Sequence, residues 1–94
     1  PGPPTGYDDW ASISGTAIAG PSMTCHWYGA TNISGATFVW RVDGNTVSTN
    51  SDLYYSASSS FTIELMVSDE ENGRIAWKTF DVTVESGAGQ CYDE

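Results

Sequence analysis

Residues 61–67 read Phe-Thr-Ile-Glu-Leu-Met-Val, and this stretch decides the fold class. Every odd-numbered side chain, from Phe61 to Val67, is bulky and apolar, whereas Thr62 and Glu64 between them are polar. Successive side chains of a β-strand point to opposite faces, so the alternation puts one apolar row on a single face. The stretch therefore predicts a strand with one side in a hydrophobic core.

The same alternation recurs on both sides of this strand. Turn signals separate the segments; Gly20-Pro21 and Asp43-Gly44 are the clearest, because glycine tolerates the positive φ of tight turns. The expected strands cover residues 10–14 with a continuation over 16–19, then 22–28, 37–42, 46–49, 53–57, 61–67 and 74–85. No segment has a helical period, and about seven short strands predict an all-β, antiparallel β-sandwich.

The last predicted strand changes its alternation along its length. Ile75 and Trp77 occupy odd positions, whereas the apolar residues from Phe80 to Val84 occupy even ones. We interpret the change as a β-bulge near Lys78, because a bulge inserts one unpaired residue and shifts the faces. The expected core contains Trp27, Phe38, Trp40, Val42, Ile63, Leu65, Val67, Val82 and Val84.

A chain of 94 residues holds one domain. Residues 1–7 contain three prolines, which remove backbone donors and favour polyproline geometry, so they predict an extended arm or linker. Residues 8–86 carry the predicted strands and are expected to form the sandwich. Residues 87–94 are a Gly-rich tail that carries Cys91.

The composition is strongly acidic, with a formal charge of −9 and only three Lys and Arg residues. Nucleic acid phosphates and anionic lipids would be repelled, which excludes nucleic acid as a partner. No apolar run is long enough to cross a bilayer, so direct membrane insertion is not expected. Abundant Ser and Thr with few Lys favours an extracellular or cell-surface β-protein.

The two cysteines, Cys25 and Cys91, lie far apart in the sequence and match no zinc-binding spacing. We expect an intramolecular disulfide between them, which requires an oxidising compartment. The alternative is a buried free Cys25 together with a free or intermolecular Cys91.

Several stretches carry a resemblance to a known class of domain. They read Phe-Val-Trp-Arg-Val-Asp-Gly at residues 38–44, Phe-Thr-Ile-Glu-Leu-Met-Val-Ser-Asp at residues 61–69 followed by Gly73, Phe-Asp-Val-Thr-Val at residues 80–84, and Cys-His-Trp at residues 25–27. In these features the chain resembles the immunoglobulin-like and PKD-type (polycystic kidney disease) domains of bacterial and archaeal surface proteins, over roughly two thirds of its length. The resemblance implies an immunoglobulin-like sandwich over residues 8–86, with a structural, spacing or adhesive role.

The sequence departs from antibody-type domains in one respect. The second cysteine, and the tyrosine that usually stands two residues before it, are missing from residues 61–67. A disulfide in this chain therefore has to tie the C-terminal tail to the strand over residues 22–28. Such a bridge would lock the last strand and the chain end, which is useful in a protein under mechanical load or proteolysis.

Catalytic groups are sparse. His26 is the only histidine, it is expected on the outward face of its strand, and no Gly-x-Ser-x-Gly turn is present. The carboxylate pairs at residues 8–9 and 70–71 are sequence neighbours in loops, and such neighbours rarely face each other across a substrate. We therefore expect neither enzymatic activity nor a cofactor.

Two further side-chain groups are weak candidate sites. The turn formed by Asp69, Glu70, Glu71 and Asn72 offers hard oxygen ligands, with Asp8 and Asp9 as added candidates. Calcium needs six to eight oxygens, so we expect a solvated turn without metal. The triplet Asn32-Ile33-Ser34 is an N-glycosylation acceptor in a predicted loop, and such triplets also arise by chance.

Exposed aromatic rings are the remaining candidate surface. Trp10, Tyr28, Tyr54, Tyr55 and Trp77 form the candidate patch, with one of the adjacent Tyr54 and Tyr55 necessarily pointing outward. Such a patch suits either stacking against carbohydrate or contact with another domain or another copy of the chain.

Two functions from different classes follow. The first is a non-catalytic extracellular structural or assembly module, either a surface-protein domain or a filament subunit. In the filament version, the Pro-rich arm of one copy would lie beside an edge strand of the next. The alternative is a carbohydrate-binding module of a secreted or surface hydrolase. The partners are then other protein domains, copies of the chain, or carbohydrate.

Overall fold

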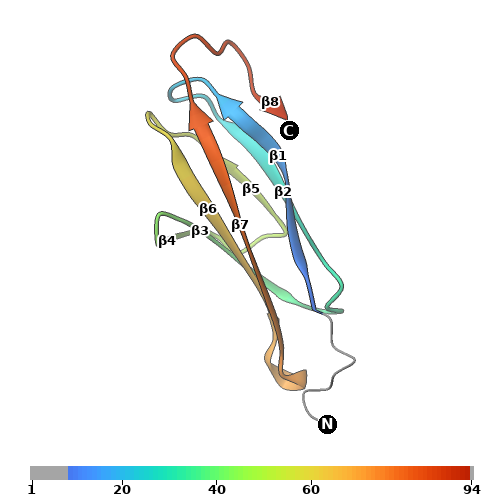
Figure 1. The fold of residues 1–94 in the computed structure, drawn as a ribbon. Coiled ribbons are helices and arrows are strands. Elements are labelled where there is room, and N and C mark those ends of the chain that lie inside the picture. Colours follow the sequence, from blue (N-terminus) through green and yellow to red (C-terminus); the bar gives the residue numbers. More distant parts are fainter. Residues whose placement is uncertain (1–8, 94) are drawn as a thin grey trace.

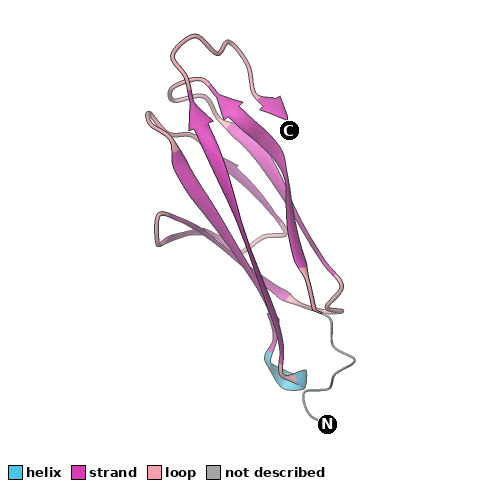
Figure 2. Ribbon diagram, viewed as in Figure 1, coloured by secondary structure: helices cyan, strands magenta, loops and turns pink. Residues whose placement is uncertain are grey.

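The computed structural model describes residues 9–93, which form eight β-strands and one short 3-10 helix (Figures 1 and 2). The strands are β1 Ala11–Ala19, β2 Cys25–Thr31, β3 Thr37–Val42, β4 Asn45–Ser48, β5 Asp52–Tyr55, β6 Phe61–Asp69, β7 Arg74–Val84 and β8 Tyr92–Asp93, and helix η1 Glu70–Asn72 links β6 to β7. The all-β prediction with about seven strands is confirmed, and the two-residue β8 is an addition. The predicted arm over residues 1–7 lies outside the described residues.

Seven of the strands form one hydrogen-bonded path in the order β4-β3-β6-β7-β1-β2-β5, which wraps around the core, and β8 pairs with β1 outside this path. Its two ends, β4 and β5, approach each other. The expected antiparallel sandwich differs from this arrangement at β1, which pairs antiparallel with β2 over residues 11–15 and parallel with β7 at Ile18 and Ala19. The sheet is therefore mixed and nearly closed, because β1 joins the two layers.

Gly15 allows β1 to change partners. It is the last residue of β1 paired with β2, and its φ of +139° is a conformation that side chains with a Cβ rarely adopt. A Cβ added at this position would lie 2.5 Å from the carbonyl oxygen of His26. Both the backbone conformation and the close approach of β2 therefore require glycine.

A Gly15→Ala variant is expected to lose at least about 1–3 kcal/mol of unfolding free energy, since the strained conformation and the close contact add to each other. Chemical denaturation of the variant measures this loss. Gly87→Ala is the matched control, because Gly87 has no heavy atom within 4 Å of the added Cβ and no positive φ. Equal stability of the two variants would contradict this role of Gly15.

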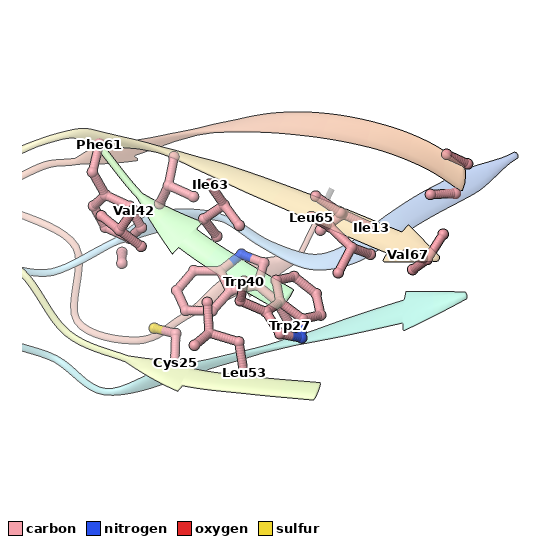
Figure 3. Packing of buried hydrophobic residues seen from close by; sticks show 14 of the residues in the cluster. Ile13, Cys25, Trp27, Trp40, Val42, Leu53, Phe61, Ile63, Leu65 and Val67 are labelled. Carbon is pink, nitrogen blue, oxygen red and sulfur yellow. The ribbon is translucent and has the colours of Figure 1, made fainter. Parts of the chain in front are cut away.

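The core lies between the two layers and contains two tryptophans, Trp27 and Trp40, both 0% exposed (Figure 3). Each indole nitrogen donates to a backbone carbonyl, Trp27 to Thr16 and Trp40 to Asn50, both at 2.7 Å. These bonds satisfy the only polar atom of each buried ring. The core prediction is confirmed, with Val42, Ile63, Leu65, Val67 and Val82 buried and with Phe38 and Val84 partly buried against them.

The predicted β-bulge near Lys78 is wrong. β7 pairs with β6 in one continuous antiparallel register, from Phe61 opposite Val82 to Asp69 opposite Arg74. The alternation changes because Ile75 and Trp77 point to the outer surface, where they are 48% and 51% exposed. The small Ala76 fills the inner position between them.

The molecule is elongated, with principal extents of 52 × 21 × 18 Å. β1 begins in the half of the molecule that carries η1, and the segment after β7 turns back at the opposite end to form β8 (Figure 1). β8 pairs antiparallel with the second half of β1. The described chain thus enters and leaves in opposite halves of the molecule.

Candidate functional site

The first candidate feature is a covalent link at the end where the chain leaves. Cys25, the first residue of β2, and Cys91, which precedes β8, form a disulfide with a Cα–Cα distance of 5.9 Å. Cys25 is 3% exposed and belongs to the core, and Cys91 packs against that core from the tail. Neither cysteine is free.

Among the described residues, no helix is long and apolar enough to cross a membrane.

This disulfide defines a short covalent path through the domain. From Asp9 the chain runs along β1 and through the turn at Gly20-Pro21 to Cys25, and the bridge then passes directly to Cys91. The bridge spans a sequence separation of 66, so β2 through β7 lie on a closed loop beside this path. Tension applied between the two ends of the described chain is transmitted by β1 and the bridge.

The second candidate feature is a ring cluster on the outer face of β2 and β5, formed by His26, Tyr28 and Tyr54. Even-numbered residues of both strands point outward, since Cys25, Trp27 and Leu53 are buried. The register places His26 opposite Tyr54 and Tyr28 opposite Asp52. Strand pairing alone therefore brings three rings and a carboxylate onto one face.

The rings of this cluster pack closely. The His26 and Tyr54 rings are stacked, with centroids 3.8 Å apart and planes 10° apart, and the Tyr28 ring lies 4.1 Å from His26 at an angle of 51°. The carboxylate of Asp52 accepts a hydrogen bond from Nε2 of His26 at 2.8 Å. Tyr28 and Tyr54 nevertheless remain 54% and 65% exposed. The rings are thus fixed in place and open to solvent.

An open pocket of about 230 Å³ lies between the ring cluster and the disulfide. Its lining comes from the ring cluster, from both cysteines of the disulfide and from two threonines: His26, Tyr28, Tyr54, Cys25, Cys91, Thr16 and Thr24. Stacked rings, a carboxylate and a neighbouring hollow together give a surface with an apolar platform and hydrogen-bonding groups at its edge.

The five aromatic residues predicted as one patch occupy different places. Tyr28 and Tyr54 belong to the ring cluster, whereas Tyr55 points inward and packs edge-on against Phe61, with ring centroids 5.1 Å apart. Trp77 lies on β7 in the other layer. Trp10 precedes β1, is 48% exposed, and its backbone N–H donates to the side chain of Asn32.

Trp77 continues an apolar row across the outer face of β3, β6 and β7. The register places Val39 opposite Met66, and Met66 opposite Trp77. Ile75 stands two residues from Trp77 on the same face of β7. In this Trp77 row, Ile75 and Trp77 are exposed, whereas Val39 and Met66 are half-buried.

The weak polar candidates stay separate from both features. Asn32 and Ser34 of the glycosylation triplet are exposed directly after β2, whereas Ile33 between them is 3% exposed and belongs to the core. In the acidic turn, the Asn72 side chain donates to Asp69 at 2.6 Å, and Glu70 and Glu71 are exposed. Asp9 pairs with Arg74 instead of joining that turn, and Asp8 lies outside the described residues.

Among residues 9–91, whose side chains the structure describes, no three His, Cys, Asp or Glu residues are grouped so that they could hold a metal ion. The sequence reasoning also missed two members of the ring cluster, His26 and Asp52. The sequence does contain aromatic or ionisable residues at alternate positions of β2 and β5. This pattern predicts a cluster only when the pairing of the two strands is known.

The sequence was also compared with known proteins. No protein-family model matches this chain, and a search of curated proteins finds no match.

Proposed function

We propose that this chain is a non-catalytic extracellular structural module that carries tension, as a domain of a surface protein or as a subunit of a filament. The disulfide between Cys25 and Cys91 is the observation that supports the proposal. A disulfide persists in an oxidising compartment, which favours the extracellular side of the membrane. The charge of −9 keeps such a module soluble and away from nucleic acid.

The mechanical argument follows from the covalent path. When both ends are pulled with the bridge intact, the load passes through β1 and the bridge. The chain of β2 through β7 lies inside the closed loop and cannot add to the end-to-end length of the stretched domain. β1 itself is held by β2 over residues 11–15 and by β7 and β8 over its second half. Even after complete unfolding, the oxidised domain would therefore have a much shorter end-to-end length than the reduced one.

Single-molecule force spectroscopy on tandem copies tests this role. Reduction should lengthen each fully stretched domain by about 220 Å, which is the loop with its sequence separation of 66 at about 3.3–3.6 Å per residue. A C25A/C91A variant should show the long extension with and without reductant. If oxidised copies already reach the long extension, the bridge does not limit the path and the proposal fails.

The filament version predicts a visible assembly. Negative-stain electron microscopy of the protein from its source should then show ordered fibres, with a repeat close to the 52 Å long axis of the domain. Dispersed particles under the same conditions would rule out the filament subunit and leave the surface-protein domain.

A further inference from the structure

We infer that the outer face of β2 and β5 is a binding site for an uncharged sugar, with Tyr54 as the stacking platform. This inference goes beyond the tension-bearing role and does not depend on it. It combines three observations on the same face: fixed exposed rings, hydrogen-bonding groups beside them, and the adjacent pocket.

The rings provide the apolar part of the site. One face of the Tyr54 ring is covered by His26, and the ring is still 65% exposed, so its other face is open to solvent. Carbohydrate rings present C–H groups that pack against such an open aromatic plane. Because the stack with His26 already orients Tyr54, little side-chain freedom is lost on binding.

Polar groups at the edge of the rings can pair with hydroxyl groups. Asp52 uses Oδ2 for the hydrogen bond with His26, and its Oδ1 has no protein partner among residues 9–91, whose side chains the structure describes. The hydroxyl groups of Tyr28 and Tyr54 also have none within that range. A carboxylate oxygen accepts from a sugar hydroxyl, and a phenol both donates and accepts, so the site offers both kinds of partner.

The pocket and the charge define the ligand further. The hollow of about 230 Å³ begins at Tyr54 and Tyr28 and continues to the disulfide, so a second ring of an oligosaccharide can enter beside the stacked one. A net charge of −9, with Asp52 in the site, repels uronic acids and sulfated sugars. Neutral oligosaccharides are therefore the class that this face accepts.

Titration of the ¹⁵N-labelled chain with neutral tetrasaccharides of glucose, xylose, mannose and N-acetylglucosamine, followed by NMR, tests the inference. At least one should give saturable shifts at Tyr28, Asp52 and Tyr54. Heparin-derived tetrasaccharides should give none. Tyr54→Ala should weaken the binding about tenfold, equivalent to about 1.4 kcal/mol for the lost stacking.

The matched control is Trp77→Ala, which removes a ring of similar exposure from the other layer and should leave binding unchanged. Asp52→Asn provides a second variant, which keeps the side-chain shape and should also weaken binding. Absence of saturable shifts with every neutral sugar would overturn the inference, as would equal binding by the Tyr54→Ala variant. Chemical shifts at these residues that change with protein concentration instead of sugar concentration would identify a contact between copies of the chain. That result would also overturn the inference.

Discussion

A Trp40→Ala variant is expected to lose about 3–5 kcal/mol of unfolding free energy, the largest effect of any single substitution considered for this chain. The Trp40 side chain is 0% exposed and lies between the two layers. Its removal leaves a cavity that the surrounding strands cannot close, and it leaves the carbonyl of Asn50 without its indole donor. Small domains have only about 5–15 kcal/mol of stability, so the variant loses a large fraction of it.

Urea denaturation followed by circular dichroism measures this loss. Trp77→Ala is the control, because Trp77 is 51% exposed and its removal should change stability by no more than about 0.5 kcal/mol. If the alanine variant does not fold, Trp40→Phe keeps an aromatic ring in the core and should lose a smaller, measurable amount of unfolding free energy. A folded Trp40→Ala variant that loses less than about 1 kcal/mol would contradict the central position of this side chain.

Loss of the disulfide is expected to cost about 4 kcal/mol. The bridge closes a loop with a sequence separation of 66, and its removal returns the corresponding chain entropy to the unfolded state. Denaturant midpoints of the oxidised protein, the reduced protein and a C25A/C91A variant measure the effect. Alanine is the suitable replacement because Cys25 is buried, and a serine hydroxyl there would lack a partner.

Two comparisons separate the bridge from the side chains that form it. The reduced protein and the C25A/C91A variant should have similar stability, and reductant should have no effect on the variant. Oxidised and reduced protein with equal midpoints would show that the loop is already restricted in the unfolded state, against the entropy argument.

The local alternation of side chains predicts most of the strands, because one face of each is buried. Residues 61–67 and 37–42 are examples, and β6 and β3 include them with the same faces buried. β7 shows the limit of this reasoning. Ile75 and Trp77 are as apolar as core residues, and their odd positions suggested a β-bulge, whereas both point outward and Ala76 occupies the inner position.

The candidate sites depend more strongly on long-range pairing than the strands do. Tyr28 and Tyr54 are both recognisable as candidate surface rings, but their contact with His26 and Asp52 arises from the β2–β5 register. Trp77 has the same local character, and it lies apart because β7 belongs to the other layer. The sequence also does not predict that β1 changes its pairing partner from β2 to β7, since Gly15 alone does not indicate which strand lies next to it.

The parallel pairing of β1 with β7 has a consequence for the order in which the domain is made. Ile18 and Ala19 pair with Thr83 and Val84, so β1 leaves the ribosome well before its partner β7 does. At about 5–20 residues per second, that delay lasts several seconds. During this time the second half of β1 has an unpaired backbone edge, which is the interval in which a nascent chain is most open to proteases and to pairing with neighbouring chains.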